Sequence, residues 1–324
     1  MSATEQNVKT INAEEFANLT AAQATQALQI DLEKNPKHLV NGTGAAIFYK
    51  IGNEFYLVGG YRSGKFLWVN GGQVKGETSL VNQIEKEFKE ETFGVLPLTE
   101  QAKRHDTCGA YTYPFGTYIS FIYIDTTSFS SKEELEACIQ KMNPTAQFYN
   151  ELFLHITANR GEKVLTPEEH AAKTEELIAE YHSLKEKGLL LVDVAANKEE
   201  VFFEKLRRLK NIGGVKEWYK TENDEFIRTY TIGEYSERSH YEALTLDELK
   251  TRLEKDKDLK KSNFFSNHTE VITSLMPEIE KATQNTMAPR VYSGRPGSPA
   301  LYQPAPVAAP VEEAQKSTLT PNHV

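Results

Sequence analysis

The pattern of hydrophobic and polar positions divides the chain into a β-rich first part and a mainly helical second part. Short runs of apolar and aromatic residues at 45–50, 55–58 and 66–69 predict three strands. Two further runs, at 109–113 and 118–125, predict two more strands. We therefore expect β-structure to dominate between residues 45 and 125.

Two segments beside these strands have the character of helices. Residues 12–34 are rich in alanine, and Asn12 is suited to cap the start of a helix. Residues 79–93 carry an apolar residue at every fourth position, namely Leu80, Ile84 and Phe88. Because this spacing puts the three side chains on one face, we expect the second helix to pack against the core.

Beyond residue 131 the pattern becomes charged and helical. Helices are predicted at residues 133–142, 167–187, 198–209 and 269–282. The segment Thr245-Leu246-Asp247-Glu248 has the form of a capping box and predicts the start of another helix. Short strands are predicted at 189–194 and 226–232. From about residue 286 the repeated Pro, Ala, Gly and Ser predict a disordered tail, because this composition buries too little apolar surface.

Charge and composition narrow the class of protein. The 324-residue chain has a formal net charge of −9, which disfavours binding to long nucleic acids, because phosphate backbones need a positive surface. No apolar run approaches the roughly 18 residues that span a membrane, and the N-terminus lacks the pattern of a signal peptide. Cys108 and Cys138 are too few for a disulfide framework, so we expect reduced thiols in a cytoplasmic protein.

A glycine turn followed by an acidic helix carries the candidate chemistry. Gly71-Gly72 precedes a loop, and the helix after it ends in Lys86-Glu87-Phe88-Lys89-Glu90-Glu91. Glu87 and Glu91 are four residues apart beside the apolar stripe, where like charges repel and burial of unpaired carboxylates is costly. A divalent cation would relieve both effects, and Mg²⁺ prefers oxygen ligands. Alternatively, the four-apart pair Lys86 and Glu90 is typical of an ordinary solvated helix.

This stretch resembles the Nudix hydrolase family, whose box reads G-x5-E-x7-R-E-U-x-E-E-x-G-U, where U is a bulky aliphatic residue. Residues 86–91 match the R-E-U-x-E-E core, and the spacing from Gly72 to Lys86 equals that from the first glycine to the arginine. Lys86 replaces the arginine, and Phe93 replaces the closing glycine. Thr78 stands at the loop glutamate, with Glu77 one residue earlier.

The resemblance implies an α+β fold, a Nudix-type α/β/α sandwich with a mixed sheet, plus a mainly helical insertion or second domain. We expect an N-terminal helical arm at 1–42 and the Nudix core at 43–130. Residues 131–221 would be the helical insertion, and residues 222–285 would complete the fold and add C-terminal helices. Residues 286–324 would be the Pro/Ala-rich tail. In the alternative, a continuous Nudix domain precedes a separate helical domain.

The resemblance also implies a function. Members of this family cleave the diphosphate link of a nucleoside diphosphate joined to another moiety, such as a dinucleoside polyphosphate, ADP-ribose or a nucleotide sugar. The cofactor would be Mg²⁺ or Mn²⁺. Carried over by position, Glu87 and Glu91 are the principal metal ligands, and the Gly72 carbonyl is a backbone ligand. Glu90 is either a third ligand or the catalytic base that activates water.

Further residues are assigned around this centre. Glu77 and Lys86 are expected to support the loop and the helix. Glu234 or Glu237 would supply the additional glutamate that some family members place on a distant loop.

Two tyrosines are candidate substrate contacts. Tyr111 and Tyr113 lie about as far past the box as a tyrosine found in family members that cut dinucleoside polyphosphates. In the alternative reading, these two residues pack their rings as ordinary strand residues.

Other functions remain open from the sequence. The displaced Glu77 and the missing closing glycine favour a non-catalytic Nudix-fold sensor that binds a nucleotide-derived small molecule. In a third reading, the helical insertion is a scaffold for a partner protein. A homodimer is also open, no membrane partner is expected, and the tail suits a docking or export segment of a bacterial effector.

Overall fold

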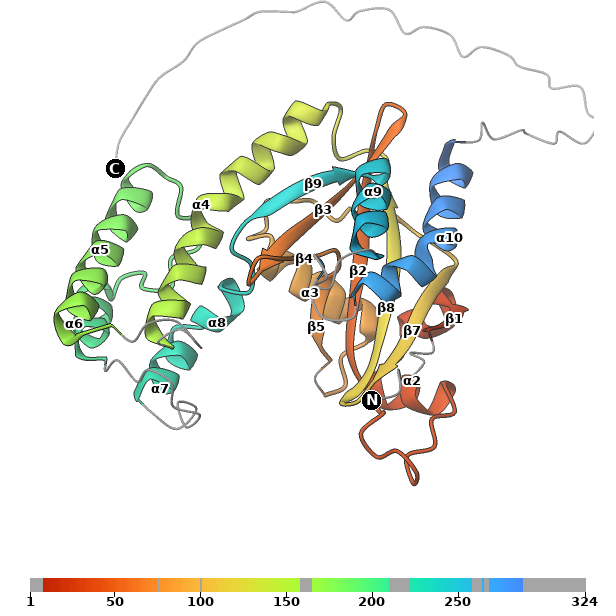
Figure 1. Cartoon of the computed structure of the whole chain (residues 1–324), viewed down its shortest axis with the longest axis horizontal. Helices are drawn as coiled ribbons and strands as arrows, with labels where there is room; N and C mark the ends of the chain where they lie inside the picture. The colour runs from red at the N-terminus through yellow and green to blue at the C-terminus, as the bar shows by residue number, and fades with distance from the viewer. Residues whose placement is uncertain are drawn as a thin grey trace, which may run out of the picture. The chain divides into compact units, whose positions relative to one another are not determined.

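The computed structural model describes residues 8–74, 76–99, 101–157, 165–209, 222–257, 264 and 268–287. These residues belong to one compact unit, Met1–Ala288. The unit is built on a mixed β-sheet with helices packed on both faces (Figure 1). This mixed α/β architecture is compatible with the predicted α+β class. The tail predicted at 286–324 lies, from residue 288 onward, outside the described residues.

In the described part of the chain, nine strands form the sheet. The main order is β1 (Val8–Asn12), β7 (Thr107–Tyr113), β8 (Gly116–Asp125), β2 (Val40–Ile51), β3 (Glu54–Arg62) and β4 (Lys65–Leu67). The remaining strands, each paired to one of these, are β5 (Asn70–Gln73) on β2, β6 (Lys103–Arg104) on β8 and β9 (Tyr241–Thr245) on β3. The central pair β2 and β8 is parallel, and the other pairs are antiparallel.

One face of the sheet is covered by the predicted amphipathic helix. The helices on this face are α3 (Leu80–Glu91), α1 (Ala13–Ala17), α2 (Ala21–Ala27) and the first half of α4 (Lys132–Ile156). Leu80, Ile84 and Phe88 are buried there, which confirms the predicted apolar stripe. This packing fixes which side of α3 is left for its carboxylates.

The opposite face is covered by α9 (Leu246–Lys257) and α10 (His268–Met287). Side chains of a strand alternate between faces, so Ile47 of β2 packs on the α3 side and Phe48 on the α10 side. The capping box predicted at the start of α9 is confirmed, because Thr245 Oγ1 accepts from the Glu248 N–H while Glu248 accepts from the Thr245 N–H.

A helical segment leaves the sheet after β8 and returns at β9. It comprises α4, α5 (Pro167–Glu186), α6 (Glu199–Arg208), α7 (Glu222–Thr229) and α8 (Ile232–Tyr235). Its far half has a separate hydrophobic cluster, whereas the first half of α4 packs against the sheet. Within the described residues, no helix is long and apolar enough to cross a membrane.

The predicted single helix at 12–34 is wrong. Asn12 caps a helix as predicted, with its Oδ1 accepting from the Glu14 N–H at 2.9 Å, but α1 ends at Ala17. The helix is interrupted at Leu19, whose carbonyl accepts a hydrogen bond of 2.9 Å from the Leu80 N–H. A tertiary contact with the start of α3 therefore divides the helical arm.

The two short strands predicted within the helical part are also wrong. Residues 226–232 lie in α7, α8 and the turn between them, because Phe226, Ile227 and Tyr230 pack into the helical cluster. Residues 189–194 form no strand; their carbonyls bond to α4 side chains instead, as in the 2.7 Å bond from Tyr149 to the Val192 carbonyl. Packing thus overrides the β-propensity of these aromatic and branched residues.

Candidate active site

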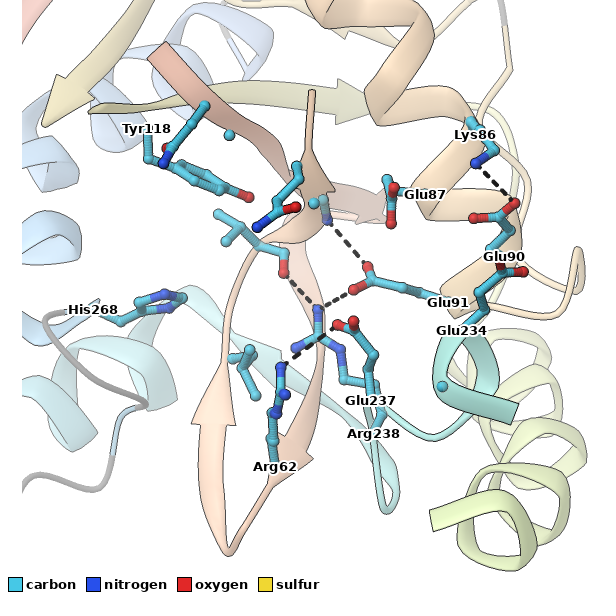
Figure 2. Close-up of a pocket in the computed structure, with 18 of the residues that line it drawn as sticks. Arg62, Lys86, Glu87, Glu90, Glu91, Tyr118, Glu234, Glu237, Arg238 and His268 are labelled. Atoms are coloured by element: carbon cyan, nitrogen blue, oxygen red, sulfur yellow. Dashed lines mark hydrogen bonds and ion pairs between the residues drawn. The ribbon is translucent and has the colours of Figure 1, made fainter. Parts of the chain in front are cut away.

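A cavity of about 480 Å³ lies beside α3 and strand β5 (Figure 2). Gly71 and Gly72 were predicted to form a turn, but the structure places them within β5, paired with Gly44 and Thr43 of β2. The sheet contributes Asn41, Gly42, Gly71, Gly72, Tyr113 and Tyr118 to its wall. Helix α3 contributes Lys86, Glu87, Glu90 and Glu91. The segment from α8 to β9 contributes Gly233, Glu234, Glu237 and Arg238. The structure therefore brings the predicted helix carboxylates together with both candidate glutamates from the distant loop.

Glu87 lies directly against Gly72 of β5. A Cβ atom on Gly72 would stand 2.6 Å from the carboxyl carbon of Glu87, so a larger residue there would displace this carboxylate from its present position. Gln83 donates a hydrogen bond of 2.5 Å to Glu87. Burial raises the pKa of Glu87, and the nearby Glu90 and Glu237 raise it further. Such mutual repulsion is the condition that a bound cation relieves.

Glu90 lies beside Lys86 at the more exposed end of the cavity. The two side chains form a four-apart ion pair of 3.4 Å, and Glu90 raises the pKa of Lys86. The structure thus contains the ion pair on which the alternative interpretation, an ordinary solvated helix, was based. Because Lys86 is about half exposed, the pair is weak and leaves Glu90 accessible from the cavity.

Glu91 is buried and both of its carboxylate oxygens accept hydrogen bonds. The Gly71 N–H donates to one oxygen at 3.1 Å, and Arg238 donates to the other at 2.8 Å. The same Arg238 nitrogen donates to the Val69 carbonyl at 2.8 Å. Burial raises the pKa of Glu91, and the charge of Arg238 limits this rise. Glu91 thus joins α3 to strand β5 and to the loop before β9.

Sequence reasoning missed the basic side of the cavity. Arg238 follows directly on Glu237, which was a candidate for the additional glutamate. In the sequence, however, an arginine within a charged segment gives no sign that it is buried. Arg62 forms an ion pair of 3.8 Å with Glu237. His268 lines the same cavity from the start of α10, and burial lowers its pKa to about 4, with Arg238 adding to this effect. These residues come from segments far apart in the chain.

Of three further residues predicted to belong to the site, only one lines the cavity. Tyr113 lines the cavity, and its hydroxyl donates a hydrogen bond of 2.8 Å to Asn41. Tyr111 is buried in the cluster on the α10 side of the sheet and does not line the cavity. Glu77 is exposed in the turn before α3 and likewise does not line the cavity.

The cavity carries more negative than positive side chains. Its carboxyl groups are those of Glu87, Glu90, Glu91, Glu234 and Glu237, and its permanent cations are Arg62, Lys86 and Arg238. In the described part of the chain, no group of three or more His, Cys, Asp or Glu side chains is arranged to hold a metal ion. Magnesium commonly binds through one or two carboxylates with waters and substrate phosphates. Glu87 and Glu90 fit such a partial ligand set.

Comparisons with known proteins find no match to this chain among protein-family models, curated proteins or solved structures.

Proposed function

We propose that the protein is a Nudix-type hydrolase that uses Mg²⁺ or Mn²⁺ to cleave the diphosphate link of a nucleoside diphosphate joined to another moiety. The single observation that carries this proposal is the juxtaposition of Gly71 and Gly72 of β5 with the carboxylates of Glu87 and Glu90 in one cavity. The layered fold around the sheet, with α3 on one face and α10 on the other, is compatible with the α/β/α sandwich of this family.

Each residue has a role in this proposal. Glu87 and Glu90 would hold the divalent cation together with the Gly72 carbonyl. When bound, the cation neutralises phosphate charge and lowers the pKa of a bound water. Arg62 and Lys86, at the cavity wall, would balance the remaining charge of the diphosphate.

The role of Glu91 differs from the one its sequence position implied. Both of its oxygens already accept hydrogen bonds, from Gly71 and Arg238, so we assign it to fixing β5 against α3. Glu234 and Glu237 both line the cavity, and either can supply the additional acidic group.

Turnover of a substrate panel tests the proposal. Dinucleoside polyphosphates, ADP-ribose and nucleotide sugars are incubated with the protein and Mg²⁺, Mn²⁺ or EDTA, and phosphate-containing products are quantified. We expect metal-dependent turnover of at least one class, reduced about 100-fold or more in Glu87→Gln because the cation loses a charged ligand. Glu85→Gln is the matched control, since Glu85 is an exposed residue of the same helix that does not line the cavity. Equal turnover in wild type and Glu87→Gln would reject the assignment.

A non-catalytic nucleotide sensor is the second candidate. The observation that favours it is the Glu91–Arg238 ion pair, which occupies a carboxylate that the family resemblance assigns to the metal. The same panel separates the two candidates. Calorimetric binding of a nucleotide with no product in either metal would support the sensor.

A further inference from the structure

Tyr118 occupies a position in the cavity that no sequence motif marks. It lies on β8 and pairs with Gly42 of the parallel strand β2 and with Tyr111 of β7. Its side chain is partly exposed and lines the cavity. The ring packs against Tyr111 at a centroid distance of 5.4 Å, so one side of it is held by the sheet.

The Tyr118 side chain packs directly against glycines of β2 and β5. A Cβ on Gly42 would stand 2.5 Å from a ring carbon of Tyr118, and a Cβ on Gly71 would stand 2.7 Å from its hydroxyl oxygen. A Cβ on Gly44 would overlap the same hydroxyl oxygen. Real Cβ atoms do not approach other atoms this closely. Glycines on two strands therefore make the space in which the tyrosine side chain is placed.

The hydroxyl of Tyr118 has no hydrogen-bond partner among the described residues. The other cavity tyrosine, Tyr113, donates to Asn41. Figure 2 shows the Tyr118 hydroxyl directed into the cavity, toward the side on which Glu87 and Glu91 lie. Burial raises the pKa of this hydroxyl well above its ordinary value, and Glu91 and Glu87 add to the rise, so the group keeps its proton. The Tyr118 hydroxyl is therefore a neutral hydrogen-bond donor beside Gly71 of β5.

We infer that Tyr118 is a substrate-binding residue whose hydroxyl donates a hydrogen bond to a non-bridging oxygen of the diphosphate. This inference rests on the proposed function, which places the diphosphate beside Gly71 and Gly72 of β5. A neutral donor suits this place because the oxygen is anionic while the surrounding wall is rich in carboxylates. The substrate class is a diphosphate, and recognition at Tyr118 is independent of the groups attached to it.

The test measures binding of α,β-methylene ADP in excess Mg²⁺ by isothermal titration calorimetry. Tyr118→Phe removes the oxygen and keeps the ring, so we expect about tenfold weaker binding with an unchanged thermal midpoint. Tyr111→Phe is the matched control, because it removes a hydroxyl from the adjacent ring, which does not line the cavity. Its affinity for the probe should equal that of the wild type.

A second variant tests the geometry. Gly42→Ala introduces a Cβ whose nearest neighbours are ring atoms of Tyr118, so we expect it to displace the ring and weaken binding to a similar extent. When Gly42→Ala is combined with Tyr118→Phe, the affinity for the probe should fall little below that of Tyr118→Phe alone. If wild type and Tyr118→Phe bind the probe equally, the inference is overturned and the proposed function stands. If the wild type does not bind the probe at all, both are overturned.

Discussion

At the residue scale, the ion pair between Glu91 and Arg238 is the feature that distinguishes this cavity from a simple acidic cluster. The two side chains are almost fully buried, with exposed fractions of 2% and 3%. A buried pair of this kind adds little net stability over apolar residues, but removal of one partner leaves an uncompensated charge. The pair also connects three separate segments of the chain, since Arg238 bonds Val69 and Glu91 bonds Gly71.

Glu91→Gln is predicted to destabilise the protein by about 3–5 kcal/mol, because Arg238 would then be buried without a counter-charge. Chemical denaturation of Glu91→Gln, Arg238→Met and the double variant measures the coupling. We expect the double variant to recover part of the loss. Glu85→Gln, on the exposed side of α3, should change the free energy of unfolding by less than about 0.5 kcal/mol. Additive effects of the two single changes would show that the pair is not coupled.

At the element scale, two histidines belong to the contact between α4 and α5, beside the apolar cluster that these helices share. The rings of His155 and His170 are stacked at a centroid distance of 4.2 Å, and both residues are buried. Thr174 donates its hydroxyl proton to the His170 carbonyl, so it accepts from Nε2 of His155. Nε2 of His155 therefore carries a proton, and its Nδ1 is buried without a hydrogen-bond partner among the described residues. The pKa of His155 is lowered to about 4, mainly by burial and also by the neighbouring His170 and Lys173.

This contact predicts a pH-dependent stability of the helical segment. The folded pKa of His155 is below its unfolded value of 6.5, so the unfolded state binds more protons between about pH 4 and 6.5. Stability is fully present above pH 6.5 and falls as the pH drops toward 4, by up to about 3 kcal/mol from this residue. His155→Gln keeps a donor for Thr174 and does not titrate. Urea unfolding from pH 4.5 to 7.5 should show a flatter dependence in this variant, and parallel curves would contradict the assignment.

At the scale of the whole molecule, the path of the chain explains how the cavity is built. The helical segment lies between β8 and β9 of one sheet, and its last helix, α8, carries Glu234 to the cavity beside α3. Tyr235 of α8 approaches Phe93 at the end of α3, with a centroid distance of 6.3 Å. The helical segment therefore completes the site, whether or not it also binds a partner protein.

Removal of residues 289–324 is predicted to leave the fold and the turnover unchanged, because Met1–Ala288 is a compact unit with its own contacts. The thermal midpoint and the metal-dependent turnover of the truncated chain should match those of the full chain. A fall of several degrees in the midpoint would show that the tail contributes to the fold.

Local pattern alone was sufficient for several elements. The five strands predicted between residues 45 and 125, the apolar stripe of α3 and the capping box of α9 are all present in the structure. The strands β1, β5 and β6 were not predicted. The helix carboxylates could be selected as candidates because their spacing on one helix is fixed by the sequence. The division of residues 12–34 and the helical state of residues 226–232 were not predictable in this way, because contacts with distant segments decide them.

The sequence by itself determined that Glu87, Glu90 and Glu91 lie on one helix shortly after Gly71 and Gly72, since this spacing is local. The pairing of these glycines with β2, in place of the predicted turn, was decided by the tertiary structure. Only the tertiary structure decided which of these carboxylates is free to meet a ligand. Arg238, about 150 positions away, neutralises Glu91, and the pairing of β2, β5 and β8 places Tyr118 over its glycines. The pairing of Glu91 with Arg238 and the placement of Tyr118 depend on burial and on long-range strand register, which a local pattern of residues does not encode.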